Sequence, residues 1–184
     1  MRSNRLKVFR LIHLSLFTAY LAFLVYFLFF SDNFGRTVTY DEYRYNLRPF
    51  AEISRYLTRV REKDFASYLV NIAGNIILFM PFGFLFPFFL KKQRLKRLKS
   101  FFSTFLITVL FCILIEGLQL VTKVGVFDVD DVIMNTFGSS LGYVIYLISV
   151  MNHRIAMTRK TAGKTADPTF NSKLKARVSS EDLV

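Results

Sequence analysis

The sequence lacks the residue types with which small domains build disulfide, metal and catalytic sites. It contains no tryptophan, one cysteine and two histidines. A single cysteine excludes an internal disulfide framework and a cysteine-rich zinc site, and we interpret Cys112, inside an apolar run, as a packing residue. The sequence has no phosphate-binding glycine loop, no nucleophile elbow and no Cys/His constellation. We therefore expect no cofactor.

The distribution of charge indicates a membrane rather than a nucleic-acid partner. The chain carries a net charge of +12 and is 53% hydrophobic. A soluble domain would interleave apolar and charged residues at helix or strand period. Here long apolar blocks alternate with short charged blocks, and the Lys and Arg residues lie at the ends of the apolar blocks, where membrane topology requires them. We expect no nucleic acid as a partner.

Four apolar blocks are long enough to cross a bilayer core as helices, which takes about 20 residues each. They cover approximately residues 11–30, 68–90, 101–121 and 132–151. The first block follows a basic stretch, as a signal peptide would, but FLFFSDNFG lacks a cleavage pattern, so we expect a signal anchor. The sequence predicts an all-α, polytopic membrane protein with one transmembrane domain over residues 1–151.

The basic residues that flank these blocks predict the orientation. They cluster before the first block, between the second and third, and after the fourth. The other two connections are nearly balanced or acidic. With four spans, all three basic clusters fall on one side of the membrane, and the positive-inside rule makes that side cytoplasmic. Both termini are therefore expected in the cytoplasm.

Two segments outside the spans have their own patterns. Residues 49–64 begin with Pro49 and repeat apolar residues at helical spacing, which predicts an extracytoplasmic amphipathic interfacial helix. A solvated helix packed on its own spans is an equally good interpretation. Residues 152–184 have few large apolar side chains and are typical of a disordered cytoplasmic tail.

Polar side chains within the spans gather in their predicted outer halves. Such groups are costly in a membrane unless they have partners, so they are the main functional signal. Helical spacing places them at one depth, whereas inner halves such as ILFMPFGFLFPFF have almost no hydrogen-bonding side chains. A polar pocket that opens outward is the natural inference. The group comprises Asn71, Asn75, Glu116, Gln119, Asp128, Asp130, Asp131 and Asn135.

These polar residues also have structural interpretations. Amide side chains can hydrogen-bond neighbouring helices, and an acidic residue in the first turn can cap a helix. Glu116 is the hardest to explain in this way, because an intramembrane carboxylate needs a partner. We expect Arg44 and Arg48, just ahead of the interfacial helix, to be its partners. The carboxylates would suit calcium or magnesium, but their spacing matches no calcium loop, so no metal is predicted.

Glycine spacing in the last block predicts a close helix contact. Gly138 and Gly142 form a GxxxG motif, which allows two helix backbones to approach. We attribute it to packing within the bundle rather than to a dimer interface, and the oligomeric state is left open.

Four segments together follow a family pattern: YNLRPFAEI (45–53), NIAGNIILFMPFGFLFP (71–87), IEGLQL (115–120) and GVFDVDDVIMNTFGSSLGY (125–143). In this order they resemble the VanZ-like family of bacterial membrane proteins, which implies the bacterial cytoplasmic membrane. Relatives often carry Arg ahead of FDVDD, where this chain has Lys123, which keeps the charge but not bidentate recognition. The motif match points to Asn46, Arg48, Pro49, Phe50, Asn71, Asn75, Pro81, Gly83, Glu116, Gln119, Asp128, Asp131, Asn135 and Gly138.

The resemblance implies a function at the cell envelope. The family is named for a member that confers low-level resistance to teicoplanin, a glycopeptide with an acyl chain. The first hypothesis is a non-enzymatic protein that binds a membrane lipid, a lipid-linked wall component or a lipoglycopeptide. Its predicted binding residues are Arg44, Asn46, Arg48, Asn71, Asn75, Glu116, Gln119, Asp128, Asp131 and Asn135.

Two alternatives stay open. One is an interfacial enzyme acting on such a lipid, with Glu116 or Asp131 as general base and Arg48 stabilising an anionic group. The other is a structural protein in which the polar cluster joins the helices and the function lies in a partner protein.

Overall fold

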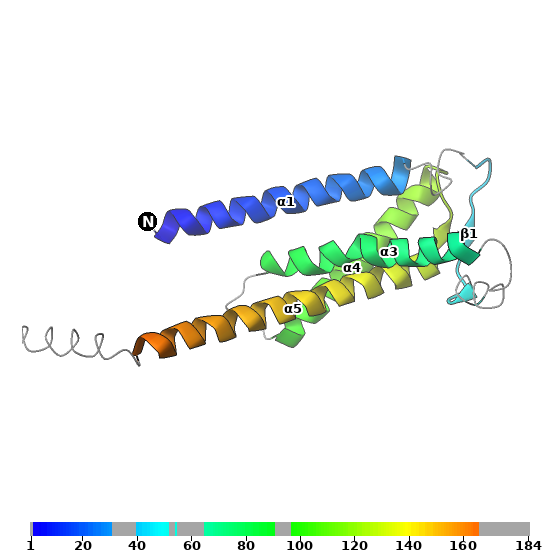
Figure 1. The fold of residues 1–184 in the computed structure, drawn as a ribbon. Helices are drawn as coiled ribbons and strands as arrows, with labels where there is room; N and C mark the ends of the chain where they lie inside the picture. The colour runs from blue at the N-terminus through cyan, green and yellow to red at the C-terminus, as the bar shows by residue number, and fades with distance from the viewer. Residues whose placement is uncertain (1, 31–39, 52–53, 55–64, 91–96, 166–184) are drawn as a thin grey trace, which may run out of the picture. The chain divides into compact units, whose positions relative to one another are not determined.

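The computed structural model describes residues 2–30, 40–51, 54, 65–90 and 97–165. Within these ranges each of the four long helices contains a segment long and apolar enough to cross a membrane. This confirms the predicted all-α class with four spans, while the orientation of the termini stays a prediction. The elements are α1 (Arg2–Phe30), β1 (Tyr45–Asn46), α3 (Phe65–Leu85), the 3-10 helix η2 (Phe86–Phe88), α4 (Arg97–Val121), β2 (Phe127–Asp128) and α5 (Val129–Thr165) (Figure 1).

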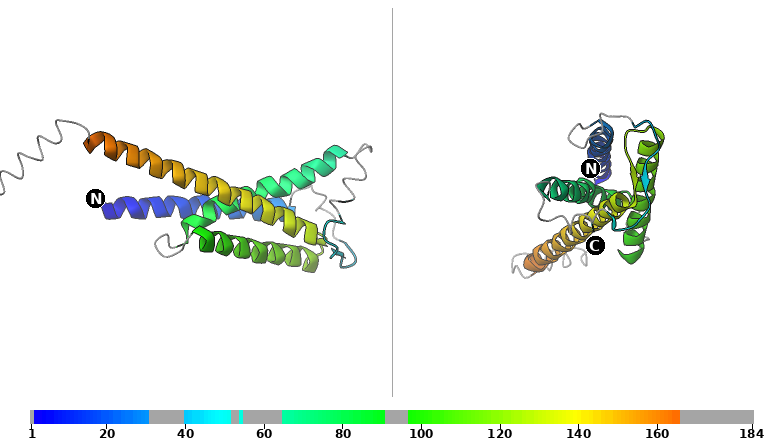
Figure 2. Two further views of the ribbon diagram at one scale, coloured as in Figure 1. Left: turned by 90° about the horizontal axis from the view of Figure 1, so that it is seen from below. Right: turned by 90° about the vertical axis from the view of Figure 1, so that its right-hand side faces the viewer.

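Helices α3 and α5 cross, as Figure 2 shows. Glycines of α5 lie at the crossing. A Cβ atom added at Gly138 would lie 2.1 Å from the carbonyl oxygen of Ile76, and one at Gly142 would lie 1.9 Å from that of Met80. Only glycine permits this separation, because any other residue would place its Cβ inside the opposite backbone. The GxxxG motif therefore forms a contact within the bundle, as the sequence predicted.

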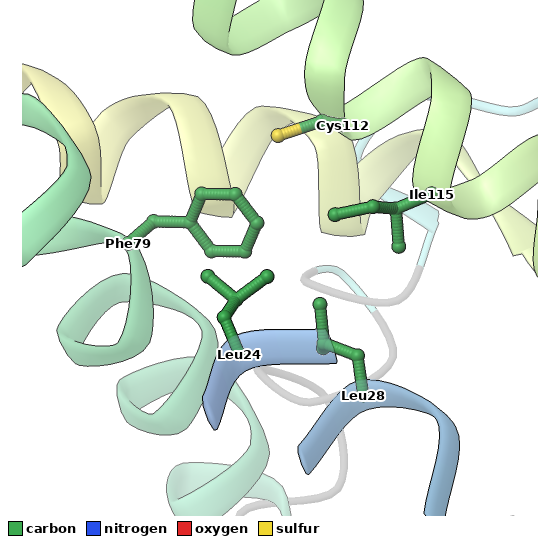
Figure 3. Close-up of a cluster of buried hydrophobic side chains, with 5 residues drawn as sticks. All are labelled: Leu24, Leu28, Phe79, Cys112 and Ile115. Carbon is green, nitrogen blue, oxygen red and sulfur yellow. The ribbon is translucent and has the colours of Figure 1, made fainter. Parts of the chain in front are cut away.

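A buried apolar cluster joins α1, α3 and α4. It consists of Leu24 and Leu28 from α1, Phe79 from α3, and Cys112 and Ile115 from α4. Figure 3 shows their side chains pointing toward one another. The thiol of Cys112 is free and buried, which confirms its interpretation as a packing residue.

Helix α5 corrects the prediction for the C-terminal segment. Residues 152–165, expected to be disordered, continue the helix to Thr165, and residues 166–184 lie outside the described residues. A shortage of large apolar side chains argues against a packed core, but it does not argue against a helix. Ala, Met, Arg and Lys favour helix, and elongation from an existing helix avoids the cost of nucleation.

The predicted interfacial helix, 49–64, lies mostly outside the described residues. At its start the amide of Ser54 donates a hydrogen bond to the carbonyl of Phe50, at 2.8 Å. The chain divides into two compact units, 1–146 and 147–184, and the candidate site belongs to the first.

Candidate functional site

Two short parallel strands join the segment 40–51 to the turn between α4 and α5. Tyr45 pairs with Phe127, and Asn46 pairs with Asp128. The amide of Phe127 also donates to the carbonyl of Arg44, at 3.0 Å. A two-residue strand has no measurable period, so this pairing could not be predicted from a sequence pattern. We call the end of the 1–146 unit at which β1 and β2 lie the strand end.

Asp128 is the centre of a hydrogen-bond network at the strand end. The side-chain amide of Asn46 donates to both of its carboxylate oxygens, at 3.3 and 3.1 Å. The amide of Asp130 donates to the same carboxylate at 2.8 Å, which makes Asp128 the N-terminal cap of α5. The amide of Asp128 donates in turn to Glu116, at 3.1 Å. One residue thus connects β1, α4 and α5.

Asp130 contacts the chain where the predicted interfacial helix begins. Its side chain is fully buried and accepts a hydrogen bond from the amide of Phe50. Phe50 has a φ of 62°, a left-handed conformation that is uncommon for a residue other than glycine. Asp130 was not among the predicted binding residues, although its position in the first turn of a helix had placed it in the polar group.

A second link joins α3 to α5. The side-chain amide of Asn75 donates to the carboxylate of Asp131, at 2.7 Å. Asn75 is buried and immediately precedes Ile76, which lies at the α3–α5 crossing. Asn71 is half-buried one helical turn away on α3. Asn135 is buried one turn along α5, and its side-chain oxygen has no hydrogen-bond partner among the described residues.

Gln119 ties α4 to α1. Its buried side-chain amide donates to the carbonyl of Leu28, at 3.0 Å. Its own carbonyl accepts from the amides of Val124 and Gly125, at 3.1 and 3.3 Å, and so closes the turn after α4. These contacts fit the structural interpretation of this residue, because every partner is a backbone group of the same bundle.

The two arginines expected beside Glu116 lie elsewhere. Both side chains are exposed, whereas Glu116 is 2% exposed. The guanidinium carbon of Arg44 lies 4.8 Å from the centre of the Tyr40 ring, and the amide of Arg48 donates to the side chain of Asn46 at 3.3 Å. Among the contacts of Glu116 is the backbone amide of Asp128, which donates to its carboxylate.

Lys123 fixes the other end of the same segment. Its ammonium group donates to the carbonyl of Asp41 at 2.7 Å and lies 5.1 Å from the centre of the Tyr43 ring. Its carbonyl accepts from the amide of Tyr40, at 3.0 Å. Lys123 has a φ of 57°, the second left-handed residue at this end. Lys123 therefore contacts the segment through both backbone and side chain.

The predicted polar residues are thus brought together, but mostly as buried supports. The carboxylates of Glu116, Asp128 and Asp130 accept hydrogen bonds from backbone amides. In the part of the chain that the structure describes, no three His, Cys, Asp or Glu side chains form a group that could hold a metal ion. The segment 43–50, with its arginines and aromatic rings, is the exposed part that the network supports.

Comparison with known proteins gives one match. The model of the VanZ/LLP1 family matches residues 17–151, a range that extends from α1 into α5 and includes the whole network. No curated protein and no solved structure matches the chain. Because the matched range covers well over half of its length, the chain belongs to the VanZ/LLP1 family.

Proposed function

We propose that this protein is a non-enzymatic envelope protein whose strand end binds the polar part of an amphiphile, either a lipoglycopeptide or a lipid-linked wall component. Membership of the VanZ/LLP1 family links the chain to glycopeptide resistance in general. Binding at the outer membrane surface would hold the drug, or the wall component that it targets, away from productive contact.

One observation carries the proposal: an exposed cationic and aromatic strip held by two carboxylates, the half-buried Asp128 and the buried Asp130. In the segment 43–50 the side chains of Tyr43, Tyr45, Leu47 and Phe50 are all exposed, and so are Arg44 and Arg48. Arginine recognises carboxylates and phosphates through paired hydrogen bonds, and tyrosine suits the boundary between lipid and water.

The hydrogen-bond network supports the strip as a preorganised surface. Asn46, in the middle of the strip, is fixed to Asp128, and the amide of Phe50 is fixed to Asp130. A surface ordered before binding loses less conformational entropy when a ligand arrives. In this interpretation Asp128 and Asp130 position the strip, and the arginines contact the ligand.

The enzyme alternative has less support. A general base must come within hydrogen-bond reach of the proton that it removes. Glu116 is buried and accepts from the amide of Asp128, and Asp131 accepts from Asn75. Neither geometry favours contact with a substrate, so binding is the function that we carry forward.

The test measures teicoplanin susceptibility in a susceptible host that expresses each variant. We expect Arg44→Gln with Arg48→Gln to lose most of the protection at unchanged protein level, because the cationic contacts are gone. Arg154→Gln removes an exposed arginine from α5 outside the site and serves as the matched control. Protection by the double variant equal to that of the unaltered protein would contradict the proposal.

A further inference from the structure

An apolar groove lies between α1 and α3. It has a volume of about 360 Å³, and almost no polar surface faces it. Both walls belong to segments long and apolar enough to cross a membrane, so the groove lies at hydrocarbon depth. Its walls include Tyr20, Phe23 and Phe27 of α1, and Gly74, Ile77 and Pro81 of α3.

The space between α1 and α3 has two causes: a hydrogen bond that fixes the two helices at one position, and a glycine that leaves the wall unfilled at another. The hydroxyl of Tyr20 donates to the carbonyl of Leu78, at 2.9 Å, and fixes the two helices there. Toward the strand end, the stacked rings of Phe23 and Phe27, with centroids 5.8 Å apart, form one wall. Opposite them Gly74 has no side chain with which to fill the space.

The surroundings of the groove select the kind of occupant. From Tyr20 to Phe27, or from Gly74 to Pro81, the helix rises by about 10 Å. At hydrocarbon depth the molecules that surround the protein are lipid chains. An apolar groove of this length therefore fits part of a single hydrocarbon chain.

The α3 wall of the groove leads toward the strand end. Gly74 lines the groove, and Asn71, three residues nearer that end, lies on the same face of the helix. A molecule with its chain in the groove would therefore bring its polar head to the strand end.

We propose that this groove binds one acyl chain of the amphiphile whose polar head the strand end holds. The inference rests on the proposed function for the position of the head. It makes the ligand class more specific: an amphiphile with at least one unbranched hydrocarbon chain, bound in part by the protein rather than by the surrounding bilayer alone. Apolar burial of the chain adds affinity in proportion to its length.

The test uses phosphatidylglycerol with a photoreactive diazirine in the middle of one acyl chain. The full-length protein in nanodiscs containing this lipid is irradiated, and the labelled residues are mapped by mass spectrometry. We expect groove residues such as Phe23 and Ile77 to be labelled at least fivefold more than exposed apolar residues of α4. Phe23 and Ile77 are themselves exposed, so labelling of these two residues equal to that of exposed apolar residues on α4 would overturn the inference.

Matched substitutions separate the groove from general lipid contact. Ile77→Trp fills the groove, whereas Ile113→Trp makes the same change at an exposed position on α4. We expect only Ile77→Trp to reduce labelling at Phe23, by at least fivefold. Phe27→Ala widens the groove without adding bulk and should raise labelling there. Equal labelling of Phe23 in all three variants would contradict the site.

The two proposals fail in different ways. If Ile77→Trp removes groove labelling while the double arginine variant still protects cells, the groove site stands and the proposed function is wrong. If the double arginine variant loses protection but labelling shows no preference, the proposed function stands and the groove site is wrong.

Discussion

The strand end and the opposite end of the 1–146 unit are held together by different interactions. At the strand end, buried amides and carboxylates bond between helices, as in the 2.7 Å contact of Asn75 with Asp131. At the opposite end, which we call the aromatic end, rings pack instead. The Phe82 ring lies 5.3 Å from that of Phe111, and the Phe88 ring lies 5.0 Å from that of Tyr146.

This difference shows which end is built for a defined surface. A hydrogen bond needs one donor and one acceptor at one distance, so the network allows a single arrangement of the segment 40–51. Ring contacts tolerate rearrangement, because hydrophobic side chains of similar volume can repack at small cost. A substitution at the strand end should therefore destabilise the protein more than a comparable substitution at the aromatic end.

The largest effect is expected where the two ends are joined. Gly138→Leu forces a side chain into the α3–α5 crossing, where even a Cβ would lie 2.1 Å from the Ile76 carbonyl oxygen. We expect a loss of about 3 kcal/mol or more, or no folded protein, measured by thermal unfolding in detergent. Gly117→Leu on α4, where nothing lies within 4 Å of an added Cβ, should melt as the unaltered protein does. Equal melting of the two variants would contradict the crossing.

The next effect should appear at the strand end alone. Asp128→Ala removes the acceptor for Asn46 and for the amide of Asp130, with an expected loss of about 2 kcal/mol. Hydrogen exchange of the Phe127 amide should become faster, because β1 and β2 lose their support. Asp41→Ala is the control, since Asp41 contributes its backbone carbonyl to Lys123 and alanine keeps it. Unchanged exchange in Asp128→Ala would remove the basis for a network-held strip.

A smaller loss is expected at the aromatic end. Phe82→Leu keeps an apolar side chain but loses the ring contacts with Phe86 and Phe111, at 5.4 and 5.3 Å. We expect about 1 kcal/mol in unfolding free energy and no change in exchange of the Phe127 amide. Phe102→Leu, at an exposed position on α4, should cost less. Faster exchange at Phe127 in Phe82→Leu would mean that the two ends are not independent.

The smallest expected effect isolates one contact between helices. A double-mutant cycle of Asn75→Ala and Asp131→Ala should give a coupling free energy of about 0.6 kcal/mol, the usual size for such a contact in a membrane protein. The pair Asn75→Ala and Asp41→Ala, which share no contact, should be additive. A coupling of zero in the first pair would show that this hydrogen bond does not join α3 to α5.

The sequence by itself determined the helices and their closest contact. Each apolar block forms one helix, because a helix satisfies its own backbone hydrogen bonds in lipid. Gly138 and Gly142 marked the crossing, since the absence of a side chain is visible in the sequence. Local rules failed at residues 152–165, where low hydrophobicity was taken as disorder although helix propensity remained high.

The tertiary structure alone decided how the strand end is assembled. Asn46 meets Asp128 across 82 residues, and the amide of Phe50 meets Asp130 across 80. The backbone amide of Asp128 donates to Glu116 across the turn between α4 and α5, a contact that no periodic pattern encodes. Hydrogen bonds between distant segments depend on where the helices place them, whereas helix formation depends only on neighbouring residues. The spans were therefore predictable, and the network, the exposed strip and the α1–α3 groove were not.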